Sequence, residues 1–456
     1  MAVHVFAGPT LPGAAVLEVV PHALVHPPVA YGDLLRIPFA SSDVVVIVDG
    51  YYHQSAAVRH KEILALLDAD VRVVGCSSMG ALRAAELDVY GMVGNGYVYE
   101  MFRDRAVDAD DEVAVAHTPA PEYRKLSEPL VAIRYVVTRA VREGLVSSTD
   151  GNAVVALARQ LPYTARSWRA LGALISRDVA ELSAAFARIE AFKIAGGADF
   201  DVKAIDALDT LSRLDELISF VGVKASPCSN GDTENVYVRE WRADCSGTVI
   251  DGVHVGNGDV LRFQQIYLAD FPRRWEAFAL ERIAQSSEED DPAAPVEDRA
   301  VAAAEVSGLT YETLTAGQRA EWLTAEEQSA AAVHEQMVKV LRRSYRSQSP
   351  AHDLMAANPD LVKDADAQKA VAEATLINRE VATWGATHSI DHLKPDVLRN
   401  HLAGVWRVSP VDEELLAAAR DRGLRSLDEA IRAVRPFYLR AHFNAANDPT
   451  PGGRAV

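Results

Sequence analysis

The sequence predicts an α/β protein: an open, mostly parallel sheet in a core domain, then a helical and small β-containing extension and a mainly helical C-terminal region. Over residues 1–145, short runs rich in β-branched residues alternate with stretches of helical apolar spacing. The strand-like run over 43–49 is apolar without alternation, which is typical of a central parallel strand covered on both faces, and 70–76 is the next strand. Strands that alternate with helices at this spacing favour an open α/β sheet.

The expected elements follow one another closely. In chain order they are a strand over 3–7, a strand over 43–49, a helix over 60–67, a strand over 70–76 and a helix over 80–87. Gly8-Pro9 ends the first strand with a turn. The second strand ends at Asp49-Gly50, where a parallel sheet opens its functional edge.

The remainder of the chain divides into two further segments. Helical spacing over 147–221 gives way to Gly, Asn and short β-like runs over 222–272, among them 236–238 and 247–250. The acidic, proline-broken stretch 286–295 is the clearest linker. We therefore expect three segments: a core over 1–145, a helical segment with a small β-containing module over 146–285, and a helical domain or arm over 296–456.

Three local expectations concern the C-terminal segment. Thr324-Ala325-Glu326-Glu327 has the pattern of a capping box at a helix start. Arg342, Arg343 and Arg346 fall on one helical stretch and are expected on a solvated face. The tail over 448–453, rich in Pro and Gly, is expected to be disordered.

Composition excludes several classes of function. The 456 residues carry a formal net charge of −18, which argues against sequence-independent binding of nucleic acid and against docking on anionic lipid. No stretch approaches the ~18 apolar residues of a membrane span, and the amino terminus lacks the basic and apolar regions of an export peptide. Three cysteines are too few and too scattered for a disulfide framework or a zinc site, so we expect a cytoplasmic protein without a bound metal or other cofactor.

The strongest local pattern is Gly75-Cys76-Ser77-Ser78-Met79-Gly80-Ala81. A strand turns into a helix through small residues, with a serine at the turn, which is the arrangement of a nucleophile elbow. The small Gly80 would let the helix pack close to the strand, and the amides of Met79 and Gly80 would stabilise an oxyanion beside Ser78. Two other interpretations stay open: a helix cap without chemistry and a non-covalent anion site.

A nucleophilic serine needs a base and a group that orients the base. One candidate segment is Asp49 to His53, which leaves the preceding strand at the same sheet edge as Ser78. A second is His60-Lys61-Glu62 at a helix start, where Lys61 is a rival base, and a third is Asp110-Asp111-Glu112 followed by His117. The residues alone do not choose among these candidates.

The amino-terminal part of the chain resembles the TfuA-like core domain. The blocks that carry the resemblance are FAGPTL (6–11), PPVAYGD (27–33), DGYY (49–52), HKEIL (60–64), SSMGALRAAEL (77–87), GMVG (91–94), DDEVAVAH (110–117) and EPLVAIR (128–134). Their order and density over about the first 140 residues make the match specific. The resemblance implies a role in backbone thioamidation of ribosomally made peptides, beside an ATP-dependent YcaO enzyme. It further implies help with sulfur supply, for which a ThiS-like carrier ending in a glycine thiocarboxylate is one source, and the precursor peptide is a further candidate partner.

With this resemblance, the elbow becomes a candidate centre for acyl transfer. Ser78 would attack the thiocarboxylate, and the amides of Met79 and of Gly8 or Gly50 would hold the oxyanion. His60 or His117 would be the base, with Glu62 or Asp111 as its orienting group, while Arg83 and Lys61 are alternative anion ligands. A non-catalytic activator and scaffold of the YcaO enzyme is the competing hypothesis, and an esterase for small molecules is a third.

Overall fold

The structure is a computed structural model of the chain. It describes residues 1–51, 56–119, 122–219, 236–288, 290–384 and 389–447. The chain forms two compact units, Met1–Val238 and Arg239–Val456. A division into two units does not test the finer three-segment division expected from the sequence, which stays a prediction.

The N-terminal unit contains five parallel strands in the order β2-β1-β3-β4-β5. The strands are β1 (Val3–Phe6), β2 (Leu24–His26), β3 (Val44–Ile47), β4 (Arg72–Cys76) and β5 (Val93–Asn95). The register places Val5 opposite Val46, and Val46 opposite Val74. Because the chain crosses β1 on its way from β2 to β3, the strand order reverses there, and a topological switch point lies between β1 and β3. The predicted open α/β sheet is confirmed.

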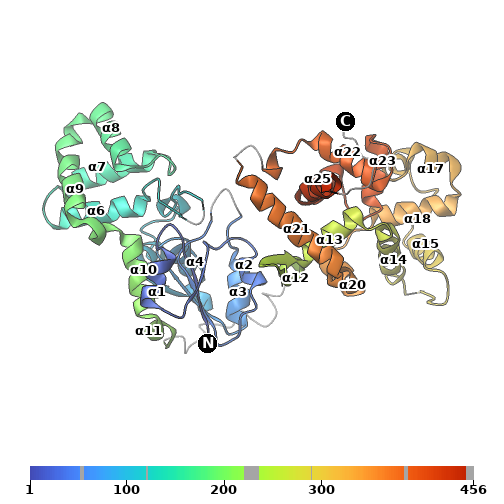
Figure 1. The fold of residues 1–456 in the computed structure, drawn as a ribbon, viewed down its shortest axis with the longest axis horizontal. Helices are drawn as coiled ribbons and strands as arrows, with labels where there is room; N and C mark the ends of the chain where they lie inside the picture. The colour runs from blue at the N-terminus through green and yellow to red at the C-terminus, as the bar shows by residue number, and fades with distance from the viewer. Residues whose placement is uncertain (52–55, 120–121, 220–235, 289, 385–388, 448–456) are drawn as a thin grey trace. The chain divides into compact units, whose positions relative to one another are not determined.

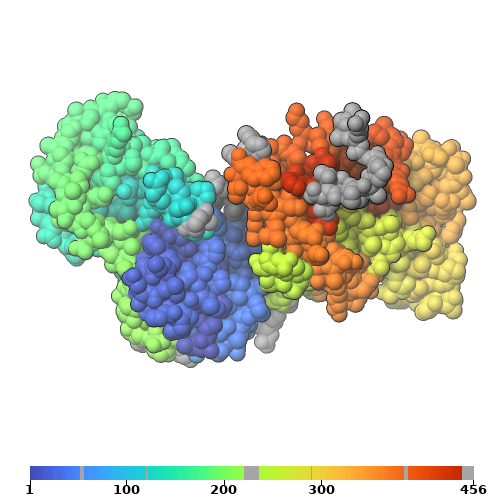
Figure 2. Space-filling view, viewed as in Figure 1, coloured from blue at the N-terminus to red at the C-terminus, as the bar shows by residue number. Residues whose placement is uncertain are grey.

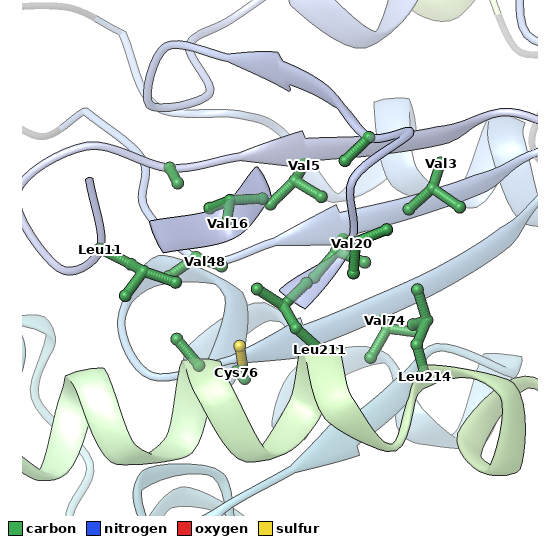
Figure 3. Packing of buried hydrophobic residues seen from close by; sticks show 14 of the residues in the cluster. Val3, Val5, Leu11, Val16, Val20, Val48, Val74, Cys76, Leu211 and Leu214 are labelled. Atoms are coloured by element: carbon green, nitrogen blue, oxygen red, sulfur yellow. The ribbon is translucent and has the colours of Figure 1, made fainter. Parts of the chain in front are cut away.

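Helices cover both faces of this sheet. The helices of the unit are α1 (Gly13–Val19), α2 (Asp33–Arg36), α3 (His60–Asp68), α4 (Met79–Leu87), α5 (Tyr97–Arg103), α6 (Leu130–Arg142), α7 (Ser148–Gln160), α8 (Trp168–Asp178), α9 (Ser183–Gly196), α10 (Val202–Ser212) and α11 (Leu214–Ser219). Figure 3 shows Val16 of α1 and Leu211 of α10 packed over Val5 and Val74 of the sheet. On the other face, α2, α3 and α4 pack on the same strands through residues such as Leu34, Ile63 and Met79.

A separate apolar core holds α6, α7, α8 and α9 together. In Figure 1 these helices are the cyan-to-green group, and α10 leads back from them to the sheet. Figure 2 shows the surface of this group in the same colours. Helix α10 therefore packs on one face of the sheet, although it is far from the strands in sequence.

The C-terminal unit is mainly helical, as predicted. Its elements are β6 (Gly247–Ile250), β7 (Val253–Gly256), α13 (Asn257–Tyr267), α14 (Phe271–Ala284), α15 (Val296–Val306), α16 (Ala316–Trp322), α17 (Ala325–Ala330), α18 (Val333–Ser344), α19 (Pro350–Ala357), α20 (Asp360–Lys363), α21 (Ala365–Ala382), α22 (Pro395–Trp406), α23 (Asp412–Arg420), α24 (Leu427–Val434) and α25 (Tyr438–Asn447). Strands β6 and β7 form an antiparallel pair.

Two sequence expectations for this region are wrong and one is confirmed. The run 236–238 begins helix α12 (Val236–Cys245) rather than a strand. Arg343 is buried and its guanidinium bonds Glu327 and Asp421, so it does not belong to a solvated face. The capping box at Thr324 is present, with Glu327 as its partner. The tail over 448–453 lies outside the described residues.

Among the described residues, no helix combines the length and the apolar character that a membrane span requires.

Candidate active site

A cavity of about 120 Å³ lies at the carboxyl ends of β3 and β4, beside the switch point of the sheet. Six separate segments of the N-terminal unit line it. The lining residues are Pro9, Pro28, Asp49, Gly50, Tyr51, Ser78, Val113, Ala114, Val115, Ala116, His117, Tyr163 and Thr164. Ligands of open α/β sheets bind at this position. The predicted meeting of Asp49, Gly50 and Ser78 at one sheet edge is therefore realised, whereas His53 lies outside the described residues.

Asp49 organises the floor of the cavity. Its Oδ2 accepts hydrogen bonds from the amides of Gly8 and Thr10, both at 2.9 Å, and its Oδ1 accepts one from the Thr10 hydroxyl at 2.6 Å. The side chain is 2% exposed. Asp49 thus links the loop after β1 to the end of β3, and both of its carboxylate oxygens are used in these structural hydrogen bonds.

The turn between β4 and α4 is strained at Ser77. This residue has φ +65°, and the Ser78 amide donates to the Cys76 carbonyl oxygen at 2.7 Å, which closes a γ-turn around it. A positive φ in a residue with a Cβ costs energy, and strained residues of this kind cluster at functional sites. The Ser77 hydroxyl is buried and, in the described part of the chain, has no hydrogen-bond partner. The strain therefore falls one residue before the predicted nucleophile.

Two glycines allow this turn to lie against the sheet. A Cβ on Gly80 would overlap the carbonyl oxygen of Ile47 in β3, and a Cβ on Gly75 would overlap the carbonyl oxygen of Gly80. The backbone of helix α4 therefore packs directly against the backbones of β3 and β4, with no side chain between them. This is the packing role expected for Gly80.

Ser78 occupies the N-cap position of α4, yet its side chain makes no capping hydrogen bond. A silent cap would accept a bond from an amide in the first helical turn. The hydroxyl lies instead at the wall of the cavity, and Ser78 is 5% exposed. This geometry favours the two interpretations in which Ser78 faces a ligand.

The amides proposed for an oxyanion hole fall into two groups. The Gly8 amide donates to Asp49 and the Gly80 amide donates to the Val48 carbonyl oxygen at 3.4 Å, so both are engaged. Within the described ranges, the amides of Gly50 and Met79 donate to no protein group. A Cβ on Gly50 would lie 2.7 Å from Cγ of Met79, so these two residues are neighbours. They are the available pair of donors.

His117 is the titratable side chain on the cavity wall that suits a base. Its Nδ1 lies 2.7 Å from the Thr118 carbonyl oxygen, which can only accept, so the neutral ring carries its proton on Nδ1. The remaining nitrogen, Nε2, is then the basic one, as a general base requires. The rings of Tyr51 and Tyr123 lie beside the imidazole, with centroids 6.3 and 5.7 Å away.

Two ion pairs hold the segment that carries His117. Buried Glu112 accepts hydrogen bonds from Arg134 Nε and Nη2 at 2.8 and 2.7 Å. Asp111 Oδ2 accepts one from the fully buried Arg166 at 2.9 Å, and Arg166 also bonds the Asp111 carbonyl oxygen. Asp111 therefore positions the start of the cavity wall and does not contact the imidazole.

Lys203 lies beneath this wall and was not among the sequence candidates. The side chain is 1% exposed, and its Nζ donates to the Val113 carbonyl oxygen at 3.0 Å. Burial lowers the pKa of Lys203 to about 8, while the charge of Asp49 opposes this shift. A clue was present in the sequence: Lys203, Asp206 and Thr210 share one face of α10 with the buried Ala207 and Leu211.

The candidates at the start of α3 lie elsewhere. His60 is half exposed, and its Nε2 lies 2.8 Å from Glu86, which also pairs with Arg83 at 2.6 Å. Glu62 is buried and accepts hydrogen bonds from the amides of Arg59 and Gly32; burial raises its pKa to about 7. None of His60, Lys61, Glu62 and Arg83 lines the cavity.

Cys76, in the strand that precedes the serine turn, is not a candidate nucleophile. Cys76 is fully buried, and burial raises the pKa of its thiol to about 12, which keeps it protonated. Across the described residues, no three His, Cys, Asp or Glu side chains gather as a metal-binding group.

The fold and this edge together define an α/β protein with a strained serine turn at the carboxyl end of β4, at the same edge as the switch point of its parallel sheet. A protein-family model described as "TfuA-like protein" matches residues 49–167. The match begins at Asp49 and includes Ser78 and His117, so it contains most of the cavity wall and supports a TfuA-like protein. The chain matches none of the curated proteins.

Proposed function

We propose that this protein supplies sulfide for YcaO-dependent backbone thioamidation of ribosomally made peptides in the cytoplasm. It would do so by hydrolysing the thiocarboxylate at the end of a ThiS-like carrier. The observation that carries the proposal is the cavity wall itself. There Ser78, whose hydroxyl makes no capping bond, His117, whose Nδ1 is engaged by a carbonyl oxygen, and Gly50 border one space of about 120 Å³, and Met79 lies directly beside Gly50.

In the first step, the Ser78 oxygen attacks the carbonyl carbon of the thiocarboxylate while His117 Nε2 accepts the hydroxyl proton. The amides of Gly50 and Met79 stabilise the negative charge that develops on the carbonyl oxygen. The C–S bond then breaks, His117 returns its proton to sulfur, and hydrosulfide leaves. The products are an ester between Ser78 and the carrier and one hydrosulfide ion.

In the second step, water attacks the ester with His117 again as base. The Ser78 hydroxyl is restored and the carrier leaves with a carboxylate. The sum is one thiocarboxylate and one water converted to one carboxylate, one hydrosulfide and one proton, with no oxidant or reductant. A small cavity bordered by Gly50 suits the slender glycine end of such a carrier.

The test is sulfide release from thiocarboxylated carrier by the full chain. We expect release by the wild type, a loss of at least 100-fold for Ser78→Ala, and a loss of about 100-fold for His117→Gln, the usual contribution of a general base. His60→Gln is the matched control, because His60 lies outside the cavity, and it should keep full activity. The absence of sulfide from the wild type, or equal release by Ser78→Ala, would refute the hydrolase.

A non-catalytic activator and scaffold of the YcaO enzyme is the second candidate. The observation that favours it is that Ser78 and His117 border the same cavity without a hydrogen bond between them. Thioamide formation by the YcaO enzyme, with free sulfide added, separates the two candidates. Stimulation by Ser78→Ala as strong as by the wild type, without hydrolysis by either, would establish the activator.

A further inference from the structure

The N-terminal unit has a second cavity, which is larger than the serine cavity. It is a surface groove of about 530 Å³ formed by α6, α7 and the end of α5. Its lining residues are Met101, Ala106, Arg134, Val137, Thr138, Val141, Ser148, Asn152, Val155, Ala156 and Arg159. All of them lie within the segment that matches the TfuA-like family model.

The groove is elongated. On α7, the lining residues from Ser148 to Arg159 recur at helical spacing along one stripe, which at ~1.5 Å per residue extends for about 16 Å. On α6, Val137 and Val141 face this stripe from the other side. An apolar floor between two helices is the form of groove that receives a peptide segment.

The two ends of the groove differ in charge. Because only residues 143–147 connect α6 to α7, the helices are antiparallel, and Arg134 at the start of α6 lies near Arg159 at the end of α7. The described residues that line the groove include no carboxylate. Arg134 shares its Nε and Nη2 with Glu112, which offsets its charge, whereas Arg159 makes no ion pair with any described residue. One end is thus basic, on a chain whose net charge is −18.

We propose that this groove is a docking site for a peptide segment of a protein partner, with apolar side chains along its length and a carboxylate at one end. The apolar side chains lie on Val137, Val141 and Val155. The carboxylate pairs with Arg159 and with the remaining Nη1 of Arg134. This surface is separate from the serine cavity, and its occupation does not depend on chemistry at Ser78.

Arg134 also connects the groove to the serine cavity. The side chain that borders the basic end bonds Glu112, and Val113 of the cavity wall follows Glu112 directly in the chain. A docked carboxylate therefore lies one side chain away from the segment that carries His117.

The test uses a library of random twelve-residue peptides displayed on phage and selected on the full chain. We expect the enriched peptides to combine apolar residues with Asp or Glu. The most enriched peptide, synthesised with a fluorescent label, should bind at least tenfold more weakly to Ala156→Trp, which fills the groove. It should weaken by a similar factor with Arg159→Glu.

Arg142→Glu is the matched control, since it makes the same charge change on an exposed residue of α6 outside the groove and should leave binding unchanged. Circular dichroism of each variant establishes that it is folded. No enrichment at all, or peptides that bind Ala156→Trp as tightly as wild type, would overturn the docking site. Enriched peptides without carboxylates, or equal weakening by Arg142→Glu, would overturn the role given to Arg159.

Discussion

At Ser77 the backbone stores strain beside a hydroxyl that has no partner among the described residues. Neither feature improves stability, so both belong to the cost of holding Ser78 and the amide of Met79 at the sheet edge. The sequence shows two adjacent serines but not which of them takes the positive φ. That choice depends on how closely α4 approaches β3, which is a tertiary effect.

Ser77→Gly should therefore stabilise the N-terminal unit. Glycine adopts a positive φ without the ~1–2 kcal/mol penalty, and the orphan hydroxyl disappears, against about 1 kcal/mol of added chain entropy. We expect a net gain of about 1 kcal/mol. Peroxide oxidation of buried Met79 and Met92 at increasing urea reports the unfolding midpoint of this unit. A lower midpoint than wild type would show that the turn is not strained.

Lys203 gives a pH dependence whose sign follows from its lowered pKa. Between about pH 8, its folded pKa, and ~10.4, the value for an unfolded lysine, the unfolded chain holds a proton that the folded chain has lost. This group therefore makes stability rise with pH across that window and adds no slope below it. We measure the urea midpoint by Met79 oxidation at several pH values. In Lys203→Met this midpoint should no longer rise with pH across the window. An identical slope in both proteins would contradict a lowered pKa.

At the scale of the element, alternation of apolar runs with helical spacing was enough to predict β1, β3, β4, α3 and α4. It did not reveal α10 as a layer of the sheet, because α10 is separated from β4 by more than a hundred residues and its contacts are entirely tertiary. For the same reason the candidate site was half predicted. Ser78, Gly50 and His117 were named and line the cavity, but His60 and Glu62 were named with them and do not line it.

The close packing of α4 on β3 predicts that a glycine-to-alanine substitution destabilises the protein at Gly80 and stabilises it at Gly404. Gly80→Ala places a methyl group against the Ile47 carbonyl oxygen, which cannot move, so we expect a loss of about 3 kcal/mol or more. Gly404→Ala, in α22 with open space around it, should gain up to about 1 kcal/mol from helix propensity. Urea midpoints reported by Met79 for the first and by Met337 for the second measure both. An unchanged urea midpoint in Gly80→Ala would show that the backbones of α4 and β3 are not in direct contact at Gly80.

In the whole molecule, the proposed chemistry belongs to the N-terminal unit, and the C-terminal unit is a separate structural part. Every described residue that lines the serine cavity belongs to Met1–Val238. The C-terminal unit has its own buried ionic centre, in which Arg343 bonds Glu327 and Asp421 at distances of 2.6 to 2.9 Å. From the sequence, Arg342, Arg343 and Arg346 on one helical stretch predicted a solvated face, because burial of a charge depends on partners far along the chain.

Arg343→Met should therefore unfold the C-terminal unit early and leave the cavity intact. Removing one partner of a buried ionic group costs about 3–5 kcal/mol. We expect earlier oxidation of Met337 and Met355 in urea, with the Met79 midpoint and sulfide release unchanged. Arg432→Met, an exposed residue of α24, should change either midpoint by less than about 0.5 kcal/mol. Parallel loss of the Met79 midpoint would contradict the assignment.

The proposed hydrolase must form an ester between Ser78 and the sulfur carrier, and rapid acid quench followed by mass spectrometry detects this ester. After mixing with thiocarboxylated carrier, the peptide that contains Ser78 should carry the acylated carrier end in the first turnover, and free carrier should have one sulfur replaced by oxygen. Ser78→Ala should show neither change, while His60→Gln should show both. Conversion of the carrier without any adduct on Ser78, and equally fast in Ser78→Ala, would show that Ser78 is not the nucleophile.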